Sequence, residues 1–220
     1  MKNEVLYHGS KTGIKGAIIP NSHKYSDFGK GFYMGTSTSQ VKSLVSNAAC
    51  PTFYQIGVDF TGIPDERIWV LSNEDWFWLV LAHRGYLDEL PFVKDYYFNK
   101  ERGYDFIIGD IADDGLSEAL DMFADCVLTD YGVLEAIKKG NLGKQYVAKT
   151  YNACKHLTIL KERRLSGGEL QEARQDWSDY RYSRLKILDG AVKNSRGKGQ
   201  YFDQIIAAEK GREDEWRKRL

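Results

Sequence analysis

Three short segments carry side chains that could bind a polar ligand, and the first lies near the start of the chain. It reads YHGS, from Tyr7 to Ser10, and follows a β-prone run that begins at Val5. His8 can donate a hydrogen bond to a hydroxyl group or accept one from it, and Gly9 lets a ligand approach the backbone closely. The same residues also fit a strand-terminal histidine whose hydrogen bonds are satisfied within the fold.

The second segment places a lysine between two glycines, just before a pair of aromatic residues. It runs from Asp27 to Met34 and reads DFGKGFYM. The glycines around Lys30 predict a pliable loop with a cation that could meet a phosphate. Tyr33 then enters a strand, where its ring offers a platform for a flat cation such as the nicotinamide of NAD⁺. A tight turn before a core strand, with Tyr33 merely packed, is the alternative.

The third segment runs from Gly143 to Val147 and reads GKQYV. It places Gln145 at the start of a β-prone run that follows a glycine-bearing loop. A polar side chain is unremarkable at such a position, so this segment gains weight only beside the other two.

Taken together and in this order, the three segments resemble the His-Tyr-Glu branch of the ADP-ribosyltransferases. The second segment is very similar to a motif of the poly(ADP-ribose) polymerase catalytic domain, with Phe32 where an Ile is usual. The chain more closely resembles a family of small bacterial proteins, several of which look like toxins of toxin–antitoxin pairs. These proteins also share the aromatic helix from Trp76 to Arg84 and the stretch 104–114. The resemblance covers roughly residues 4–161.

The resemblance implies that NAD⁺ is bound as a substrate and that no metal is needed. His8, Tyr33 and Gln145 would be the catalytic residues, with His8 on the adenosine ribose and Tyr33 stacked on the nicotinamide. Macromolecular acceptors, either protein or nucleic acid, and an antitoxin protein would be the partners. The residues that the resemblance assigns to NAD⁺ binding are His8, Gly9, Ser10, Lys30, Gly31 and Tyr33.

Gln145 departs from the glutamate that the polymerases carry. Cleavage of the nicotinamide–ribose bond develops positive charge on the ribose, as in glycosidases. An amide can accept a hydrogen bond from the ribose 2′-hydroxyl, but it has no charge and cannot act as a base. Such a loss costs on the order of 10²–10³ in rate, which favours transfer of one unit over polymer formation. Gly143 stands where arginine-modifying transferases have a second Glu. Leu44 stands where the polymerases have a second stacking tyrosine.

Three functions of different kinds therefore remain open. The leading one is an NAD-dependent mono-ADP-ribosyltransferase that acts as a bacterial toxin or defence effector. In the second, water replaces the acceptor, and the protein is an NAD glycohydrolase. In the third, Gln145 marks a module that binds NAD⁺ or ADP-ribose without turnover.

Two further polar features are ambiguous. Asp113 and Asp114 could form a metal or acid–base pair, but acidic residues at a helix N-terminus also complement the helix dipole. Arg84 could bind a phosphate or cap the end of its own helix.

Composition sets limits on partners and location. The formal net charge is zero, so nothing in the overall balance calls for a polyanionic partner or an anionic membrane. The three cysteines are widely spaced and form no metal or disulfide pattern, which favours a reducing compartment. The N-terminal residues hold no apolar signal region, and the run Trp76–Ala82 is too short to span a bilayer. We expect a soluble, cytoplasmic protein with no membrane partner.

The strands and helices expected around the three segments indicate an α+β fold. In residues 1–161 we expect an ADP-ribosyltransferase-like split mixed β-sheet with flanking helices, and in residues 162–220 a charged, helical C-terminal extension. The extension is basic, and it could pack on the body, bind an antitoxin or recognise a target. Strands are expected near 5–7, 31–34, 53–60, 67–71, 104–108, 145–149 and 157–160, and helices near 39–49, capped by Ser39, 73–84, capped by Ser72, 115–124 and 130–139.

Overall fold

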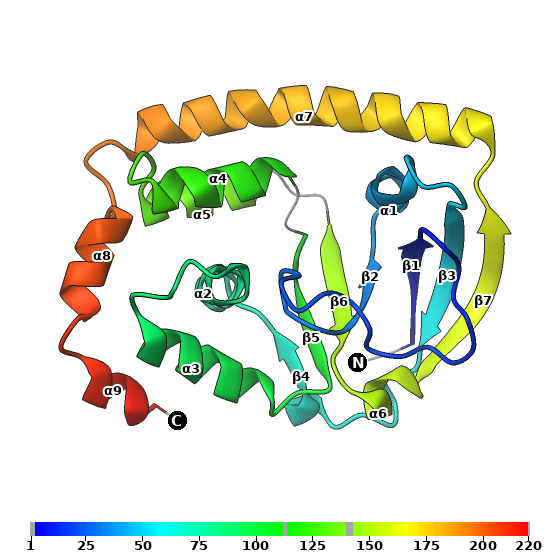
Figure 1. Cartoon of the computed structure of the whole chain (residues 1–220), viewed down its shortest axis with the longest axis horizontal. Helices are drawn as coiled ribbons and strands as arrows, with labels where there is room; N and C mark the ends of the chain where they lie inside the picture. The colour runs from blue at the N-terminus through cyan, green and yellow to red at the C-terminus, as the bar shows by residue number, and fades with distance from the viewer. Residues whose placement is uncertain (1–2, 112–113, 140–142, 220) are drawn as a thin grey trace.

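The computed structural model describes residues 3–111, 114–139 and 143–219. Over these residues the chain is an α+β structure built on one mixed sheet of seven strands, in the order β4-β5-β6-β2-β1-β3-β7 (Figure 1). Strand β4 is parallel to β5, and the other neighbouring strands are antiparallel. The predicted α+β class is confirmed. The strands are β1 Glu4–Ser10, β2 Phe32–Gly35, β3 Thr52–Val58, β4 Ile68–Val70, β5 Phe106–Asp110, β6 Lys144–Ala148 and β7 Leu157–Arg164.

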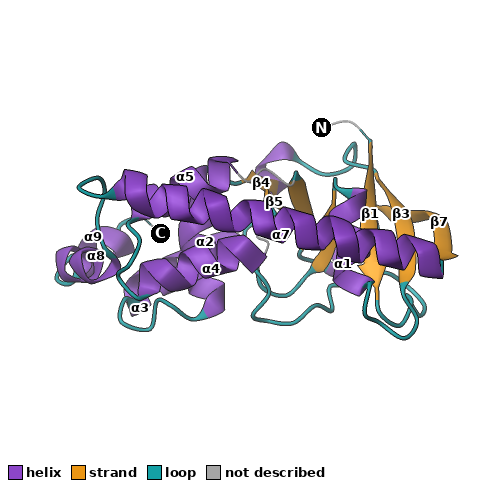
Figure 2. Cartoon of the chain, turned by 90° about the horizontal axis from the view of Figure 1, so that it is seen from above, coloured by secondary structure: helices purple, strands orange, loops and turns teal. Residues whose placement is uncertain are grey.

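Helices gather at one end of the molecule and most of the sheet at the other, with the long helix α7 running across both (Figure 2). In the part of the chain that the structure describes, no helix is both long and apolar enough for a membrane span. The helices are α1 Thr38–Val45, α2 Asn73–Arg84, α3 Pro91–Glu101, α4 Asp114–Ala124, α5 Asp130–Lys139, α6 Tyr151–Cys154, α7 Gly167–Ser195, α8 Phe202–Glu209 and α9 Glu213–Arg217, with a 3₁₀ turn at Asp65–Arg67.

Strands β5 and β6 are buried on both faces, and their side chains alternate between two apolar clusters. Phe106 and Tyr146 belong to a cluster formed largely by strand residues, called here the strand-face cluster. Ile107 and Val147, one position along, belong to a cluster that includes the apolar side chains of α2, called here the helix-face cluster. Since successive side chains of a strand point to opposite faces, each residue of β5 and β6 is assigned to a face by its position alone.

Serine side chains cap the N-termini of α1 and α2. The Ser37 hydroxyl accepts from the Gln40 amide at 3.3 Å and caps α1, so the prediction of Ser39 as the cap is wrong. The Ser72 hydroxyl accepts from the Asp75 amide at 3.0 Å and caps α2, as predicted. Asp75 and Glu74 also place negative charge in the first turn of α2, where it complements the helix dipole.

The C-terminal helices pack onto the body. Helix α7 contacts α1, α4 and α5. The buried residues Leu188, Phe202 and Trp216 belong to the helix-face cluster. The Arg184 guanidinium donates to the Ala136 carbonyl at 3.1 Å and joins the basic extension to α5, in the acidic part of the body. The boundary predicted between residues 161 and 162 falls inside β7.

Candidate functional site

Strands β1 and β2 separate soon after they meet. Among the described residues, Tyr7 and Gly35 are the only pair between them. From there β1 continues along β3, and β2 continues along β6. The Nδ1 atom of His8 lies 2.7 Å from the carbonyl oxygen of Tyr33 and bridges the gap that opens between the two strands.

Beside this gap lies a small pocket of about 110 Å³, bordered by α1. His8, Tyr33 and Gln145, from three separate segments of the chain, all line it. Leu44 lines it from α1 and is 58% exposed. Pockets for drug-sized ligands occupy about 300–1,000 Å³, so this space fits one small ring rather than a whole dinucleotide. The other lining residues are Tyr7, Gly9, Met34, Gly35, Gln40, Val41 and Ile111.

The three predicted catalytic side chains reach the gap from both faces of the sheet. The His8 ring lies over Phe32, with centroids 4.3 Å apart, on the side of the strand-face cluster. Tyr33 packs against the helix-face cluster. Gln145 precedes Tyr146 of the strand-face cluster, so its side chain points to the helix face. The three residues therefore lie at one gap, but their side chains do not point to a common position.

The bond to the Tyr33 carbonyl fixes which nitrogen of His8 carries the proton. A carbonyl only accepts, so Nδ1–H donates, and Nε2 of the neutral ring keeps its lone pair. Burial lowers the pKa of His8, while the bond to Tyr33 opposes that shift. His8 therefore presents a hydrogen-bond acceptor at neutral pH, which suits a hydroxyl group such as that of a ribose.

The phenol of Tyr33 anchors the loop that precedes β2. Its hydroxyl donates to the Gly29 carbonyl at 2.7 Å and accepts from the Phe28 amide at 2.9 Å. Burial, followed by the charge of Asp27, raises the pKa of Tyr33 well above its usual value. The phenol therefore stays neutral, and its ring is held in place where it lines the pocket.

Gln145 is buried, and its amide is oriented by two acceptors. Its Nε2 donates to Oδ2 of Asp27 and to the carbonyl oxygen of Asp110, each at 3.4 Å. Both partners only accept here, so the NH₂ group must face them and Oε1 is left as the acceptor. The Trp76 indole donates to the same Asp110 carbonyl at 2.8 Å and fixes it against α2.

Asp27 is a site residue that the sequence reasoning did not single out, although it opens the DFGKGFYM segment. Arg84 donates to its Oδ1 through Nε at 3.1 Å and Nη2 at 2.6 Å, and to the Ser117 hydroxyl at 2.6 Å. Helix α2 ends at Arg84, with Gly85 as its C-cap, and the Arg84 guanidinium is paired with Asp27. It holds the carboxylate that orients Gln145.

A cluster of three polar side chains that the sequence did not reveal, Glu101, His83 and Lys149, supports the loop before β2. Oε2 of Glu101 lies 2.8 Å from Nε2 of His83 and 3.3 Å from Nζ of Lys149. Burial would raise the pKa of Glu101, but the hydrogen bond from His83 and the charge of Lys149 outweigh it and lower the pKa. Lys149 also donates to the Phe28 carbonyl, so an ionised, paired cluster fixes the loop.

Three glycines of the motifs are explained by packing. A Cβ at Gly9 would lie 2.8 Å from the Val41 carbonyl oxygen, because α1 packs directly on β1. A Cβ at Gly31 would collide with the side chain of Val147 on β6. Gly143 has φ +97° and faces the Thr36 hydroxyl, so no second glutamate fits at this position.

Residues 4–159 match the model of a family described as "Protein of unknown function (DUF3990)". The chain belongs to this family. The match covers β1 to the first part of β7, and with them every residue that lines the pocket at the gap. No curated protein and no solved structure matches the chain.

Three of the predicted NAD⁺-binding residues, Ser10, Lys30 and Gly31, do not line this pocket. Ser10 ends β1 and accepts from the Thr12 amide at 3.4 Å. Lys30 is exposed and lines a different pocket, formed with α2 and α3. Asp113 and the side chain of Asp114 lie outside the described residues. Within the described ranges, no group of three or more His, Cys, Asp or Glu side chains could hold a metal ion.

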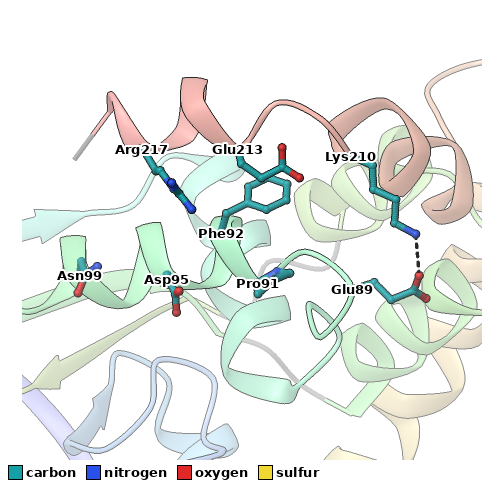
Figure 3. A pocket seen from close by; sticks show the side chains of 8 residues that line it. All are labelled: Glu89, Pro91, Phe92, Asp95, Asn99, Lys210, Glu213 and Arg217. Atoms are coloured by element: carbon teal, nitrogen blue, oxygen red, sulfur yellow. Dashed lines mark hydrogen bonds and ion pairs between the residues drawn. The ribbon is translucent and has the colours of Figure 1, made fainter.

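A cavity of about 570 Å³ lies between α3 and the C-terminal helices α8 and α9 (Figure 3). Glu89 and Lys210 form an ion pair of 3.2 Å across it. None of the predicted site residues lines this cavity. It shows that body and extension share a surface, and it is separate from the gap between β1 and β2.

Proposed function

We propose that this protein binds NAD⁺ at the gap between β1 and β2 and transfers its ADP-ribose unit to a macromolecular acceptor. One observation carries the proposal: His8, Tyr33 and Gln145, each from its own segment, line one pocket where two neighbouring strands part. The parting of β1 and β2 is also what the split sheet of an ADP-ribosyltransferase fold requires. The resemblance of the three segments to that superfamily supports the same assignment.

An elongated ligand of two halves suits this arrangement better than a compact one. The acceptor on His8 lies toward the strand face, and the Gln145 amide lies toward the helix face. We assign the small pocket to the nicotinamide, with Tyr33 on one side and the exposed Leu44 on α1 as an aliphatic cover. His8 Nε2 would then accept from a hydroxyl of the adenosine ribose.

Gln145 would act on the ribose beside the nicotinamide. Its Oε1 would accept the 2′-hydroxyl bond, because its NH₂ is already committed to Asp27 and Asp110. As the bond to nicotinamide breaks, its electron pair leaves with nicotinamide and positive charge develops on the ribose. The amide carbonyl stabilises this charge only through its dipole and cannot activate a hydroxyl group as a base. The acceptor must therefore supply its own nucleophile, which favours transfer of a single ADP-ribose unit.

The neighbours of Gln145 explain an amide at this position. A glutamate would put a second carboxylate about as close to Asp27 as Gln145 is now, and it would face the Asp110 carbonyl with no proton to donate. Like charges at such a distance disfavour each other strongly. An amide at position 145 therefore suits the carboxylate of Asp27 better than a second carboxylate would.

The test is incubation with NAD⁺ labelled on its adenylate half, together with a bacterial lysate. We expect label in macromolecules with the native chain and with Tyr151→Ala, whose tyrosine is 65% exposed outside the pocket. Tyr33→Ala and His8→Ala should abolish it. Protease or nuclease treatment of the product would separate a protein acceptor from a nucleic acid.

The same assay distinguishes the two other functions. Nicotinamide release without labelled macromolecules would replace the transferase with an NAD glycohydrolase. Saturable NAD⁺ binding with neither release nor transfer would replace it with a binding module. A role as a toxin held by an antitoxin rests on the resemblance, and growth arrest that depends on Tyr33 when the chain is expressed alone would support it.

A further inference from the structure

A second pocket, of about 460 Å³, lies between the loop before β2 and helices α2 and α3. It shares no lining residue with the pocket that holds His8 and Gln145. Its volume lies within the range of pockets that hold small organic ligands, about 300–1,000 Å³. Four of the side chains that line it are cationic and two are aromatic, namely Lys24, Lys30, Lys94 and Arg102, and Tyr25 and Phe98.

Four cationic side chains converge on this pocket in a protein with zero net charge. The side chains of Lys30 and Arg102 make no hydrogen bond or ion pair with any described residue. Lys94 pairs with Asp88 at 2.8 Å, but Asp88 is 78% exposed. The carboxylate of Glu101, which also lines the pocket, is already committed to His83 and Lys149. The pocket therefore carries positive charge that the described part of the chain does not neutralise.

Helix dipoles do not account for this cluster. Arg102 follows the C-terminus of α3, where a cation complements the dipole. Lys94, however, lies in the first half of that helix, and Lys24 and Lys30 come from the loop. Lys24, Lys30 and Arg102 have no partner carboxylate among the described residues, and an anion bound between them would offset their mutual repulsion.

Two aromatic rings complete the pocket. Tyr25 is 58% exposed, and its ring lies against Lys24 and His23. Phe98 lies against His83, with ring centroids 4.9 Å apart. Such rings bind a flat heterocycle by stacking, while the cations bind a phosphate.

We propose that this pocket binds a mononucleotide, with its phosphate on the cationic side chains and its base on Tyr25 and Phe98. The loop links this site to the gap between β1 and β2. Lys30 follows Gly29, whose carbonyl accepts from the Tyr33 hydroxyl. A nucleotide on Lys30 therefore fixes the loop that positions Tyr33, although the binding does not depend on the function proposed above.

The experiment is calorimetric titration with AMP, adenosine and inorganic phosphate. A Lys30→Gln/Arg102→Gln variant should bind AMP about tenfold more weakly or worse, since charge-assisted bonds to phosphate are lost. Lys155→Gln/Lys161→Gln is the matched control, because it removes the same charge at two exposed positions. Adenosine should bind much more weakly than AMP, and Tyr25→Ala/Phe98→Ala should weaken AMP but not inorganic phosphate.

Equal AMP affinity in the Lys30→Gln/Arg102→Gln variant and its control would overturn the proposal. So would adenosine binding as tightly as AMP, or loss of AMP binding in His8→Ala, which would place the nucleotide at the other pocket. AMP binding that survives in His8→Ala supports the proposal even if NAD⁺ binding fails everywhere. If a 5′-phosphorylated hexaribonucleotide binds more tightly than AMP, the natural ligand is the end of an RNA strand. If it binds more weakly than AMP, the ligand is a free nucleotide.

Discussion

At the scale of single residues, the chemistry proposed for the gap depends on how Gln145 is held. Its amide is fixed by Asp27 and Asp110, and Asp27 is itself held by Arg84. An amide oriented by two acceptors presents its carbonyl without reorganising, which is the condition for electrostatic stabilisation of a developing charge. Its lack of charge limits that stabilisation, and its surroundings are adapted to the neutral group.

A double-mutant cycle tests this dependence. Gln145→Glu should lower the free energy of unfolding and leave turnover no higher, because the new carboxylate faces Asp27. In an Asp27→Asn background, the introduced amide can donate to the introduced carboxylate, and the two changes should couple favourably by about 0.5–3 kcal/mol. Thermal or urea unfolding of the four proteins measures the coupling. Additive effects would show that Asp27 does not determine the residue at position 145.

His8 predicts a dependence of stability on pH. Its pKa is lower in the folded chain than the usual 6.5, mainly through burial. Between the folded and the unfolded pKa of His8, the unfolded chain therefore binds more protons than the folded chain. The contribution of neutral His8 to the free energy of unfolding is complete above the unfolded pKa, and it is lost as the pH falls toward the folded pKa. The free energy of unfolding of His8→Gln should fall less steeply from about pH 7 to about pH 5. The exposed His23→Gln should keep the native slope, and equal slopes in both variants would contradict this account.

At the scale of elements, helix α1 packs closely on β1 at Gly9, which lines the pocket. Gly9→Ala would push a methyl group against the Val41 carbonyl, 2.8 Å from the ideal Cβ position. We expect a loss of about 1–3 kcal/mol in the free energy of unfolding. Gly190→Ala is the matched control, since nothing lies within 4 Å of that Cβ and alanine favours a helix such as α7. A gain of stability in both variants would refute the close contact.

The elements that local sequence specifies were predictable. Ser72 before an aromatic helix predicts α2, and β-prone runs predict β2 and β6 to within one residue of their observed ends, whereas β1 continues to Ser10, three residues beyond its predicted end. Helix α3 was not predicted, because its buried residues are spaced among polar ones and Leu90 provides no side-chain cap. Ser37 and Ser39 are chemically equivalent caps, and only the fold distinguishes them. The Asp27–Arg84 pair joins residues far apart in sequence, so spacing could not reveal it.

At the scale of the whole molecule, the C-terminal helices are part of the core. Phe202 is 9% exposed and lies 5.1 Å from Phe123, centroid to centroid. Phe202→Ala should cost about 3–5 kcal/mol and lower the midpoint of one shared unfolding transition. Tyr182→Ala, at a residue 64% exposed on α7, should have little effect. Separate transitions for residues before and after 161 would instead show that the extension folds on its own.

Calorimetric titration with NAD⁺ shows whether the gap between β1 and β2 binds this dinucleotide. The native chain and Tyr151→Ala should bind with the same affinity. Tyr33→Ala and His8→Ala should bind at least about tenfold more weakly while keeping a cooperative thermal transition. The absence of NAD⁺ binding by the folded native chain, or equal affinity in all four proteins, would contradict the account.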